Sequence, residues 1–440
     1  MVGILKESKI GVIGGLGHIG LIQAACLAKL GYKTKAYDIN VEKMKGILQG
    51  KMPFEEPDLA DLVIETINSG LLKMTSQITD LEEVDIIFIC VGTPSLSNGE
   101  ADLSQVYAAV EQVAHNRNKH CLAVVKSTVP VGTSRKLTKY LKEHNLSEKV
   151  TMVSNPEFLR EGSGVTDFWE PARIVVGGEV KEAAEKVAKI YAPPGVPIIN
   201  TSWENSELIK YASNAFLATK ISFINEIALL SEKVGGDIRV ISQGMGQDPR
   251  INPMFLEAGV GFSGPCLEKD LKSLIAQFQK VHRKASILES VLQVNEGQRQ
   301  GLVEKLQEQL GNLKDKKIGI LGMAFKAETD DVRQSHSLPI VKQLLSLGAV
   351  VTVSDPWVKT AKQGGLSEAE LPGVEWVSSP YEAAGGKDAI LILTEWQEYK
   401  ELDFKKLKAL MLNPLIVDGR NLFNAKDMER LKINYLGVGI

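Results

Sequence analysis

Cys266 stands in a segment of turn-forming and charged residues, Gly-Phe-Ser-Gly-Pro-Cys-Leu-Glu-Lys-Asp at positions 261–270. A thiol in this setting can add covalently to an aldehyde, and the adduct can then lose a hydride and be oxidised to the level of an acid. A free thiol titrates near about 8.5, and the ammonium of Lys269 would favour the reactive thiolate. Most lone cysteines are instead small buried hydrophobes. Because glycines, a proline and charges surround Cys266, we predict a chemical role for it.

The other three cysteines show the buried pattern. Cys26, Cys90 and Cys121 each lie in or beside an apolar run, and we predict that they belong to the core. The four cysteines include no CxxC pair, and the six histidines form no HExxH motif. These spacings indicate neither a disulfide framework nor a metal site.

A glycine-rich motif near the N-terminus, Gly-Leu-Gly-His-Ile-Gly at 15–20, lies between a predicted strand and a predicted helix. In that context the glycines permit a tight turn and close approach of the backbone to a pyrophosphate, whose charge the helix N-terminus binds. Asp38 closes the next strand, where an acid accepts hydrogen bonds from the adenosine ribose and repels a 2′-phosphate. The motif therefore predicts NAD, in preference to NADP, as the cofactor.

Lys210 and Asn214 are four residues apart in a stretch of helical periodicity. Their Cβ atoms should lie about 5–6 Å apart on one helix face. An ammonium and an amide on one face can stabilise an alkoxide or a thiohemiacetal oxyanion. Taken singly, such residues more often lie on a solvated face. The pair indicates a dehydrogenase, and Cys266 indicates that its oxidation continues beyond the aldehyde.

The composition limits the possible partners and the number of domains. With 440 residues, 44% of them hydrophobic, the chain should divide into two or three domains with sizeable cores. A net charge of -3 with dispersed lysines and arginines argues against a nucleic-acid partner. No apolar run approaches the about 18 residues of a membrane span, and residues 1–8 do not resemble a signal peptide. We expect a cytoplasmic protein that binds neither nucleic acid nor membranes.

An internal repeat indicates the elements that position these residues. Lys-Ile-Gly-Val-Ile-Gly at 9–14 recurs as Lys-Ile-Gly-Ile-Leu-Gly at 317–322, and each is followed by a helical stretch and a second strand. Those second strands end at Asp38 and Asp355. Two doubly wound α/β units are the simplest interpretation. Later strands correspond as well, residues 84–91 with 387–393 and residues 124–127 with 415–418.

Between the two units, from about residue 205 to residue 310, the pattern is helical with almost no strand signal. We therefore predict an α/β fold with two doubly wound Rossmann-like domains, joined by a long central helix and its helical partners. Turn-rich stretches at 192–195 and 311–314 lie near the two boundaries. The predicted domains are an NAD-binding domain at 1–200, a helical linker at 201–310, and a second Rossmann-like domain at 311–440.

The motifs together resemble the UDP-glucose/GDP-mannose dehydrogenase family of nucleotide-sugar 6-dehydrogenases, and its UDP-glucose branch most closely. Members oxidise the sugar C6 by four electrons with NAD, through a thiohemiacetal and a thioester on a cysteine. The resemblance therefore implies conversion of UDP-glucose to UDP-glucuronate. It is carried almost end to end by residues 15–20, 91–94, 126–133, 155–162, 207–214, 261–270, 325–326, 329–333 and 418–420.

The resemblance implies catalytic roles for individual residues. Cys266 would be the nucleophile, and Lys210 and Asn214 would support the oxyanion. Asp270 would orient Lys210 and a water near C6, and would act in the first proton abstraction.

A second implied group acts on the thioester. Thr128 and Glu161 would hold the water that hydrolyses it, with Glu161 as the base.

The resemblance also implies the ligand contacts. Arg250 would reach the sugar site of the neighbouring subunit, so that the residues from 201 to 310 also dimerise and a homodimer or a larger homo-oligomer is the competent form. The residues from 311 to 440 would then bind UDP. The NAD contacts would be Gly15, Leu16, Gly17, His18, Ile19, Gly20, Asp38, Lys43, Thr93, Thr128 and Arg333. The nucleotide-sugar contacts would be Phe158, Leu159, Glu161, Lys210, Asn214, Arg250, Phe255, Phe262, Phe325, Lys326 and Arg420.

The cysteine segment departs from the pattern usual in the family, Gly-Phe-Gly-Gly-Ser before the cysteine and Phe, then Pro or Gln, after it. Ser263 should bring a Cβ close to the sugar, and Glu268 could offset the effect of Lys269 on the thiol. These changes leave open which sugar is oxidised, with a UDP-N-acetylhexosamine or GDP-mannose as alternatives to UDP-glucose.

Two interpretations from other classes remain. A two-electron hydroxyacid dehydrogenase would leave Cys266 and the second α/β unit without a role. A catalytically silent NAD-binding protein should have lost one of Cys266, Lys210, Asn214 and Asp270, and the sequence retains all of them.

Overall fold

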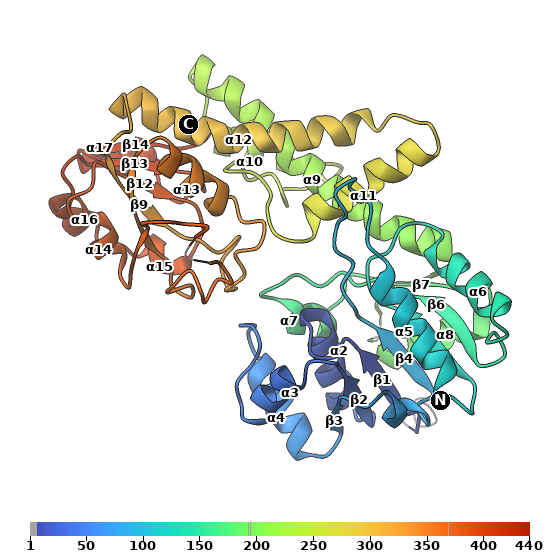
Figure 1. Ribbon diagram of the computed structural model, residues 1–440. Helices are drawn as coiled ribbons and strands as arrows, with labels where there is room; N and C mark the ends of the chain where they lie inside the picture. Colours follow the sequence, from blue (N-terminus) through green and yellow to red (C-terminus); the bar gives the residue numbers. More distant parts are fainter. Residues whose placement is uncertain (1–6, 192, 194, 368) are drawn as a thin grey trace. The chain divides into compact units, whose positions relative to one another are not determined.

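A computed structural model describes residues 7–191, 193, 195–367 and 369–440 (Figure 1). The predicted boundary at 192–195 lies partly outside these residues, as does most of the N-terminal stretch examined for a signal peptide. The described chain forms two compact units. The first contains the residues up to Ser213 together with Lys272–Arg283, and the second contains Asn214–Leu271 and Lys284–Ile440.

The first unit is built on an eight-stranded sheet with the order β3-β2-β1-β4-β5-β6-β7-β8. Its first six strands follow the 3-2-1-4-5-6 order of a dinucleotide-binding α/β fold. Neighbouring strands pair in parallel except β6 and β7. The strands are β1 (Ile10–Ile13), β2 (Thr34–Tyr37), β3 (Leu72–Thr75), β4 (Ile86–Ile89), β5 (Cys121–Val125), β6 (Val150–Ser154), β7 (Ile174–Gly177) and β8 (Ile198–Thr201).

Helices cover both faces of this sheet, and an apolar cluster lies on each face. The strand β4, Ile-Ile-Phe-Ile, is buried at every position, as a parallel strand between two helical layers must be. The helical segments are α2 (His18–Lys29), α3 (Val41–Leu48), α4 (Leu59–Asn68), the short η1 (Ile78–Leu81), α5 (Ser104–His115), α6 (Thr133–Glu143), α7 (Gly164–Trp169) and α8 (Lys181–Tyr191).

The second unit contains a six-stranded sheet with the order β11-β10-β9-β12-β13-β14, which repeats the order of the first six strands above. Every pair in it is parallel. The prediction of an α/β fold with two doubly wound domains is therefore confirmed. The strands are β9 (Lys317–Leu321), β10 (Val350–Ser354), β11 (Glu375–Val377), β12 (Ala389–Ile392), β13 (Leu415–Asp418) and β14 (Asn434–Leu436).

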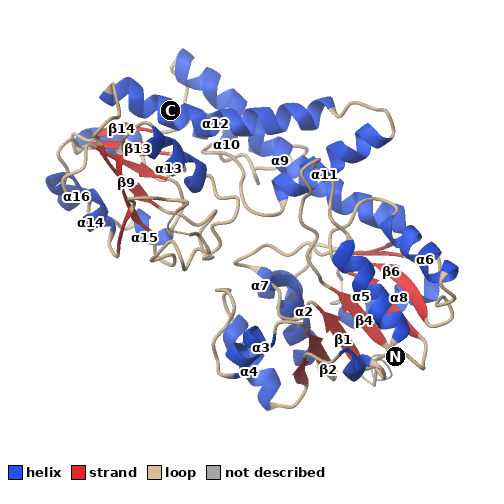
Figure 2. Ribbon diagram, in the orientation of Figure 1, coloured by secondary structure: helices blue, strands red, loops and turns tan. Residues whose placement is uncertain are grey.

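The stretch predicted to be helical forms four long or medium helices: α9 (Trp203–Val234), α10 (Ile238–Gly246), α11 (Leu267–Lys280) and α12 (Ser286–Leu310). Figure 2 shows α12 and α13 on one side of the second sheet, with α14 and α16 on the other. Within the described residues, no helix is both long and apolar enough to cross a membrane. The remaining helices are α13 (Ser337–Ser346), α14 (Pro380–Ala384), α15 (Gln397–Lys400), α16 (Phe404–Leu410) and α17 (Ala425–Arg430).

Candidate active site

The predicted dinucleotide turn connects β1 to α2 in the first unit. A Cβ on Gly20 would overlap the Gly14 carbonyl, and a Cβ on Gly15 would lie 2.8 Å from the Ala36 side chain. Asp38 follows β2 and accepts a hydrogen bond from Leu16 N at 3.2 Å. The turn therefore leaves main-chain N–H groups and a carboxylate where a dinucleotide requires them, and NAD fits these residues.

Glu56, which sequence reasoning did not single out, ties this turn to the loop that carries Glu161. The Glu56 side chain has no exposed surface, and its Oε2 lies 2.9 Å from Nε2 of His18, the first residue of α2. Its carboxylate also accepts from Gly162 N at 2.8 Å and from Gly164 N at 2.7 Å. A buried carboxylate with these partners fixes the loop relative to the turn.

We expect Glu56→Gln to weaken NAD binding by roughly tenfold, because charge-assisted hydrogen bonds contribute about 1.5–3 kcal/mol each and the amide retains only part of them. Fluorescence titration with NAD measures the change. Glu65→Gln is the matched control, because Glu65 makes an exposed ion pair with Lys29 on the same sheet face. Unchanged NAD affinity in Glu56→Gln would show that the turn holds its shape without this carboxylate.

Two further residues predicted to contact NAD lie together. Thr93 Oγ1 donates to the Thr128 carbonyl at 2.9 Å. Beyond Thr128, the N-terminus of α6 is held by Glu207 of α9, whose carboxylate accepts from Gly132 N at 2.6 Å and Ser134 N at 2.8 Å. Burial raises the pKa of Glu207. Glu207 thus connects the Thr128 turn to the helix that carries Lys210.

Lys210 is buried on α9, not solvated. Its Nζ donates to Glu157 Oε1 at 2.9 Å, and the two side chains are 6% and 8% exposed. The Lys210 ammonium also lies 5.3 Å from the centre of the Phe158 ring, while the guanidinium of Arg173 stacks 3.7 Å from that ring. Burial lowers the pKa of Arg173. Sequence reasoning missed Glu157 and Arg173, although Glu157 lies inside the motif at 155–162.

Asn214 and Asp270 come together in the second unit. Asn214 Nδ2 donates to Asp270 Oδ2 at 2.6 Å, and Lys269 Nζ donates to Asp270 Oδ1 at 2.6 Å. Asp270 is 1% exposed. Lys269 therefore shares its charge with a carboxylate, a pairing that the sequence did not predict.

Cys266 immediately precedes α11 and is exposed. The other cysteines differ, since burial raises the pKa of Cys90 to about 12 and that of Cys121 to about 11. Cys26 and Cys121 are buried, and Cys90 is only partly exposed. Thiols with raised pKa values stay protonated at neutral pH, and among the described cysteines only Cys266 is exposed.

The predicted nucleotide-binding residues of the second unit cluster at the ends of β9 and β13. Arg420 Nη2 donates to the Phe325 carbonyl at 3.0 Å, and the Lys326 ammonium lies 5.8 Å from the Phe325 ring centre. Phe262 is buried nearby, with its main chain bonded to Asn295. The Ser263 hydroxyl donates to the same Phe325 carbonyl at 3.2 Å.

The remaining predicted residues have the following places. Arg250 and Arg333 are exposed and make ion pairs with Asp248 and Asp331, respectively. Lys43 lies on α3, Leu159 and Glu161 are partly buried in the loop before α7, and Phe255 is partly buried with a φ of 65°.

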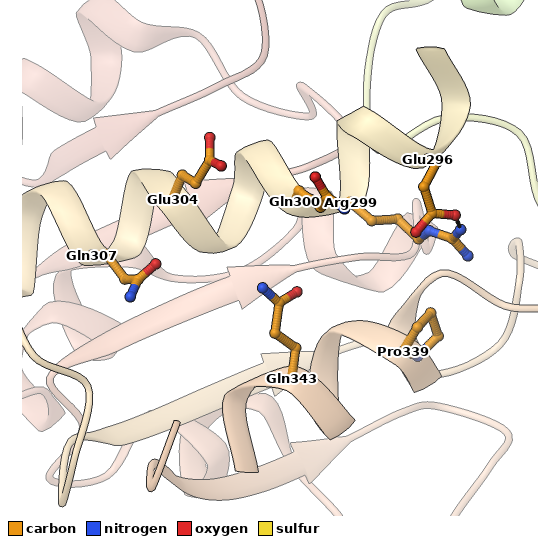
Figure 3. Close-up of a pocket in the computed structure, with 7 residues that line it drawn as sticks. All are labelled: Glu296, Arg299, Gln300, Glu304, Gln307, Pro339 and Gln343. Carbon is orange, nitrogen blue, oxygen red and sulfur yellow. Dashed lines mark ion pairs between the residues drawn. The ribbon is translucent and has the colours of Figure 1, made fainter. Parts of the chain in front are cut away.

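A polar pocket of about 380 Å³ lies between α12 and α13 (Figure 3). It is lined by Glu296, Arg299, Gln300, Glu304, Gln307, Pro339 and Gln343. None of these lining residues belongs to the predicted site, so the pocket is a separate feature of the second unit.

Comparison with known sequences identifies three domains of one family. The models described as UDP-glucose/GDP-mannose dehydrogenase family NAD binding domain, central domain and UDP binding domain match residues 8–194, 204–297 and 319–425. The UDP-glucose 6-dehydrogenase TuaD of Bacillus subtilis (strain 168) is 40% identical over 433 residues, 98% of this chain and 93% of the relative. The UDP-glucose 6-dehydrogenase of Rickettsia conorii is 42% identical over 428 residues, 97% of this chain and 98% of the relative.

Two solved structures are similar to this chain over almost its whole length. A UDP-glucose dehydrogenase from the hyperthermophilic archaeon Pyrobaculum islandicum matches with a TM-score of 0.90 and 35% identity, covering 98% of each chain. A UDP-D-ManNAc dehydrogenase from Pyrococcus horikoshii matches with a TM-score of 0.85 and 27% identity, covering 98% of this chain and 99% of the other.

Proposed function

The chain belongs to the UDP-glucose/GDP-mannose dehydrogenase family, and from this premise we infer that it oxidises UDP-glucose to UDP-glucuronate with NAD. UDP-glucose, two NAD⁺ and one water give UDP-glucuronate in its carboxylate form, two NADH and three protons. The observation that carries this function is the exposed Cys266 at the start of α11, in the unit that also pairs Asn214 with Asp270. A dehydrogenase that stopped at the aldehyde would not require this thiol.

In the first stage the C6 hydroxyl is oxidised to an aldehyde. Asp270 is the group to which the hydroxyl proton is passed, directly or through a water, and Lys210 and Asn214 stabilise the alkoxide. NAD supplies the hydride acceptor for both oxidations, and Gly15 to Gly20, Asp38, Lys43, Thr93, Thr128 and Arg333 would hold it.

In the second stage the Cys266 thiolate adds to the aldehyde carbon and forms a thiohemiacetal. Lys210 and Asn214 support its oxyanion, and loss of the second hydride gives a thioester. Water then adds to the thioester carbon, and Cys266 leaves as the thiolate. Thr128 and Glu161 are proposed to hold this water. Glu157 accepts a hydrogen bond from Lys210.

The nucleotide sugar is proposed to lie against Phe158, Leu159, Glu161, Phe255, Phe262, Phe325, Lys326 and Arg420, with the cations facing the diphosphate. Ser263 is expected to place its Cβ near the sugar, and its hydroxyl donates a hydrogen bond to the Phe325 carbonyl. The division into domains at 1–200, 201–310 and 311–440 and the cytoplasmic location stay predictions.

The stoichiometry of NADH tests this function. With excess NAD and limiting UDP-glucose, we expect two NADH for each sugar, because alcohol and acid differ by four electrons. UDP-N-acetylglucosamine and GDP-mannose are assayed in parallel. Two NADH with UDP-N-acetylglucosamine or GDP-mannose alone would support the mechanism but identify a different substrate. A single NADH for each sugar would contradict the thioester route.

A homodimer is the proposed assembly, supported by an apolar stripe on α9. Phe216, Phe223 and Leu230 recur every seven residues and are 65%, 47% and 61% exposed. Residues at this spacing lie on one helix face, and exposed apolar stripes of this kind mark interfaces. Arg250, whose side chain is 87% exposed, is free of packing that would prevent it from reaching a second subunit.

We expect Phe223→Asp to convert the dimer to a monomer, because the carboxylate would be buried without a partner at the interface. Light scattering coupled to size-exclusion chromatography measures the mass. Leu412→Asp is the matched control, since Leu412 is also an exposed apolar residue but lies between α16 and β13 and does not belong to the α9 stripe. A Phe223→Asp protein that keeps the dimer mass would place the interface elsewhere.

A further inference from the structure

The segment that leads to Cys266 is held by main-chain hydrogen bonds within the second unit. Val260 N donates to the Gly419 carbonyl, at the end of β13, at 2.7 Å. Asn295 of α12 donates to the Phe262 carbonyl at 2.9 Å and accepts from Phe262 N at 2.8 Å. The backbone path towards the nucleophile is therefore fixed before Cys266 is reached.

The Phe325 carbonyl joins this segment to the proposed diphosphate site. It accepts from Ser263 Oγ at 3.2 Å and from Arg420 Nη2 at 3.0 Å. Arg420 also donates from Nε to the Leu393 carbonyl at 2.7 Å and makes an ion pair with Glu395 at 3.1 Å. The Phe325 oxygen thus accepts one hydrogen bond from Ser263, in the loop that carries Cys266, and one from Arg420, which is proposed to bind the nucleotide.

The Phe325 ring also packs against the loop. Gly264 has a φ of 89°, and a Cβ at this position would lie 2.6 Å from Phe325 Cδ2. Because packed groups have little free space between them, a displacement of the Phe325 ring would also displace the Gly264 backbone. Gly264 lies two residues before Cys266, so a movement of the turn that contains Phe325 must also move the loop at 261–266.

We propose that Ser263 is a positioning residue that couples diphosphate binding at Arg420 and Lys326 to the reactivity of Cys266. A diphosphate draws the Arg420 donors towards itself, since a hydrogen bond between two ionised groups is stronger than one from a cation to a neutral carbonyl. The hydrogen bond from Ser263 then becomes the main one to the Phe325 carbonyl. It holds the loop at 261–266 against the turn that contains Phe325, which restricts the motion of the Cys266 thiol. The proposal rests on the proposed function, because it takes Arg420 and Lys326 as nucleotide ligands.

Alkylation of Cys266 by iodoacetamide tests the coupling without any turnover. The rate is followed by mass spectrometry of the Cys266 peptide, with and without saturating UDP and without NAD. Coupling free energies between sites usually correspond to factors of about 5–150, so we expect UDP to slow alkylation of the unmodified protein by at least about fivefold. In Ser263→Ala the protection should fall below about twofold, and Ser263→Thr, which keeps the hydroxyl, should restore it.

Two controls separate coupling from folding and from shielding. Calorimetry should show that Ser263→Ala still binds UDP, with an affinity lowered by no more than about the coupling factor of fivefold, because coupling between two sites is reciprocal. Binding at saturating UDP shows that the variant is folded and its site is occupied. Ser231→Ala removes a comparable buried bond in the same unit, from Ser231 Oγ to the Gly439 carbonyl at 3.0 Å, and should keep full protection.

Equal protection in Ser263→Ala would show that UDP merely shields the thiol, and would overturn the proposal. Binding of UDP without any change in alkylation of the unmodified protein would also overturn the coupling, but would leave the proposed function intact. A failure of the unmodified protein to bind UDP would overturn both.

Discussion

Replacing Cys266 by serine is expected to abolish acid formation, with a fall in kcat of at least about a thousandfold. A serine hydroxyl is far less ionised at neutral pH than a thiol and forms a poorer leaving group when water attacks the acyl intermediate. Cys266 is exposed at the start of a helix, and the substitution conserves its size. The loss should therefore be chemical, not structural.

Three measurements define the result for Cys266→Ser: steady-state NADH formation, NAD affinity, and mass spectrometry of the protein after mixing with UDP-glucose and NAD. NAD affinity should stay within about twofold of the unmodified protein, because the dinucleotide turn belongs to the first unit. An ester-like adduct on Ser263 is not expected, whereas one on the new serine would locate the nucleophile. Cys121→Ala, which removes a buried thiol, should keep its activity. Unchanged turnover in Cys266→Ser would exclude the thioester mechanism.

Replacing Lys210 by alanine is expected to lower kcat by about 10²–10³-fold, the usual effect of removing one oxyanion donor. The same change should destabilise the protein, because Glu157 is left as a buried carboxylate without its cation. Removal of one partner from a buried ion pair costs about 3–5 kcal/mol. The variant should thus show both a slower reaction and a lower Tm.

The double variant Lys210→Ala with Glu157→Gln separates the two effects. A neutral amide does not need the ammonium, so most of the lost Tm should return while kcat stays low. Lys139→Ala is the control, since Lys139 makes an exposed pair with Glu143 on α6. Recovery of kcat together with Tm would mean that Lys210 only stabilises the fold.

Local patterns were sufficient to predict the architecture, and they also supplied the prediction of the reacting groups. The repeated strand at 9–14 and 317–322 predicted two doubly wound sheets, because a buried parallel strand must be apolar on both faces and ends in a recognisable turn. The Gly15 to Gly20 turn and the Cys266 segment each act through residues adjacent in sequence, so their spacing is readable. The strands β7 and β8, which extend the first sheet, had no counterpart in the repeat and were not predicted.

Only the tertiary structure decided which residues hold the predicted reacting groups and the segments that carry them. Glu56 reaches Gly162 across 106 residues, Glu157 reaches Lys210 across 53, and Ser263 reaches Phe325 across 62. Hydrogen bonds between such distant positions impose no periodicity or spacing on the chain, so each residue read alone resembles an ordinary surface carboxylate or hydroxyl. The sequence by itself determined the kind of fold and predicted which groups react. Packing decided which buried carboxylates and carbonyls hold those groups, because burial makes an unpaired charge costly and thereby selects its partner.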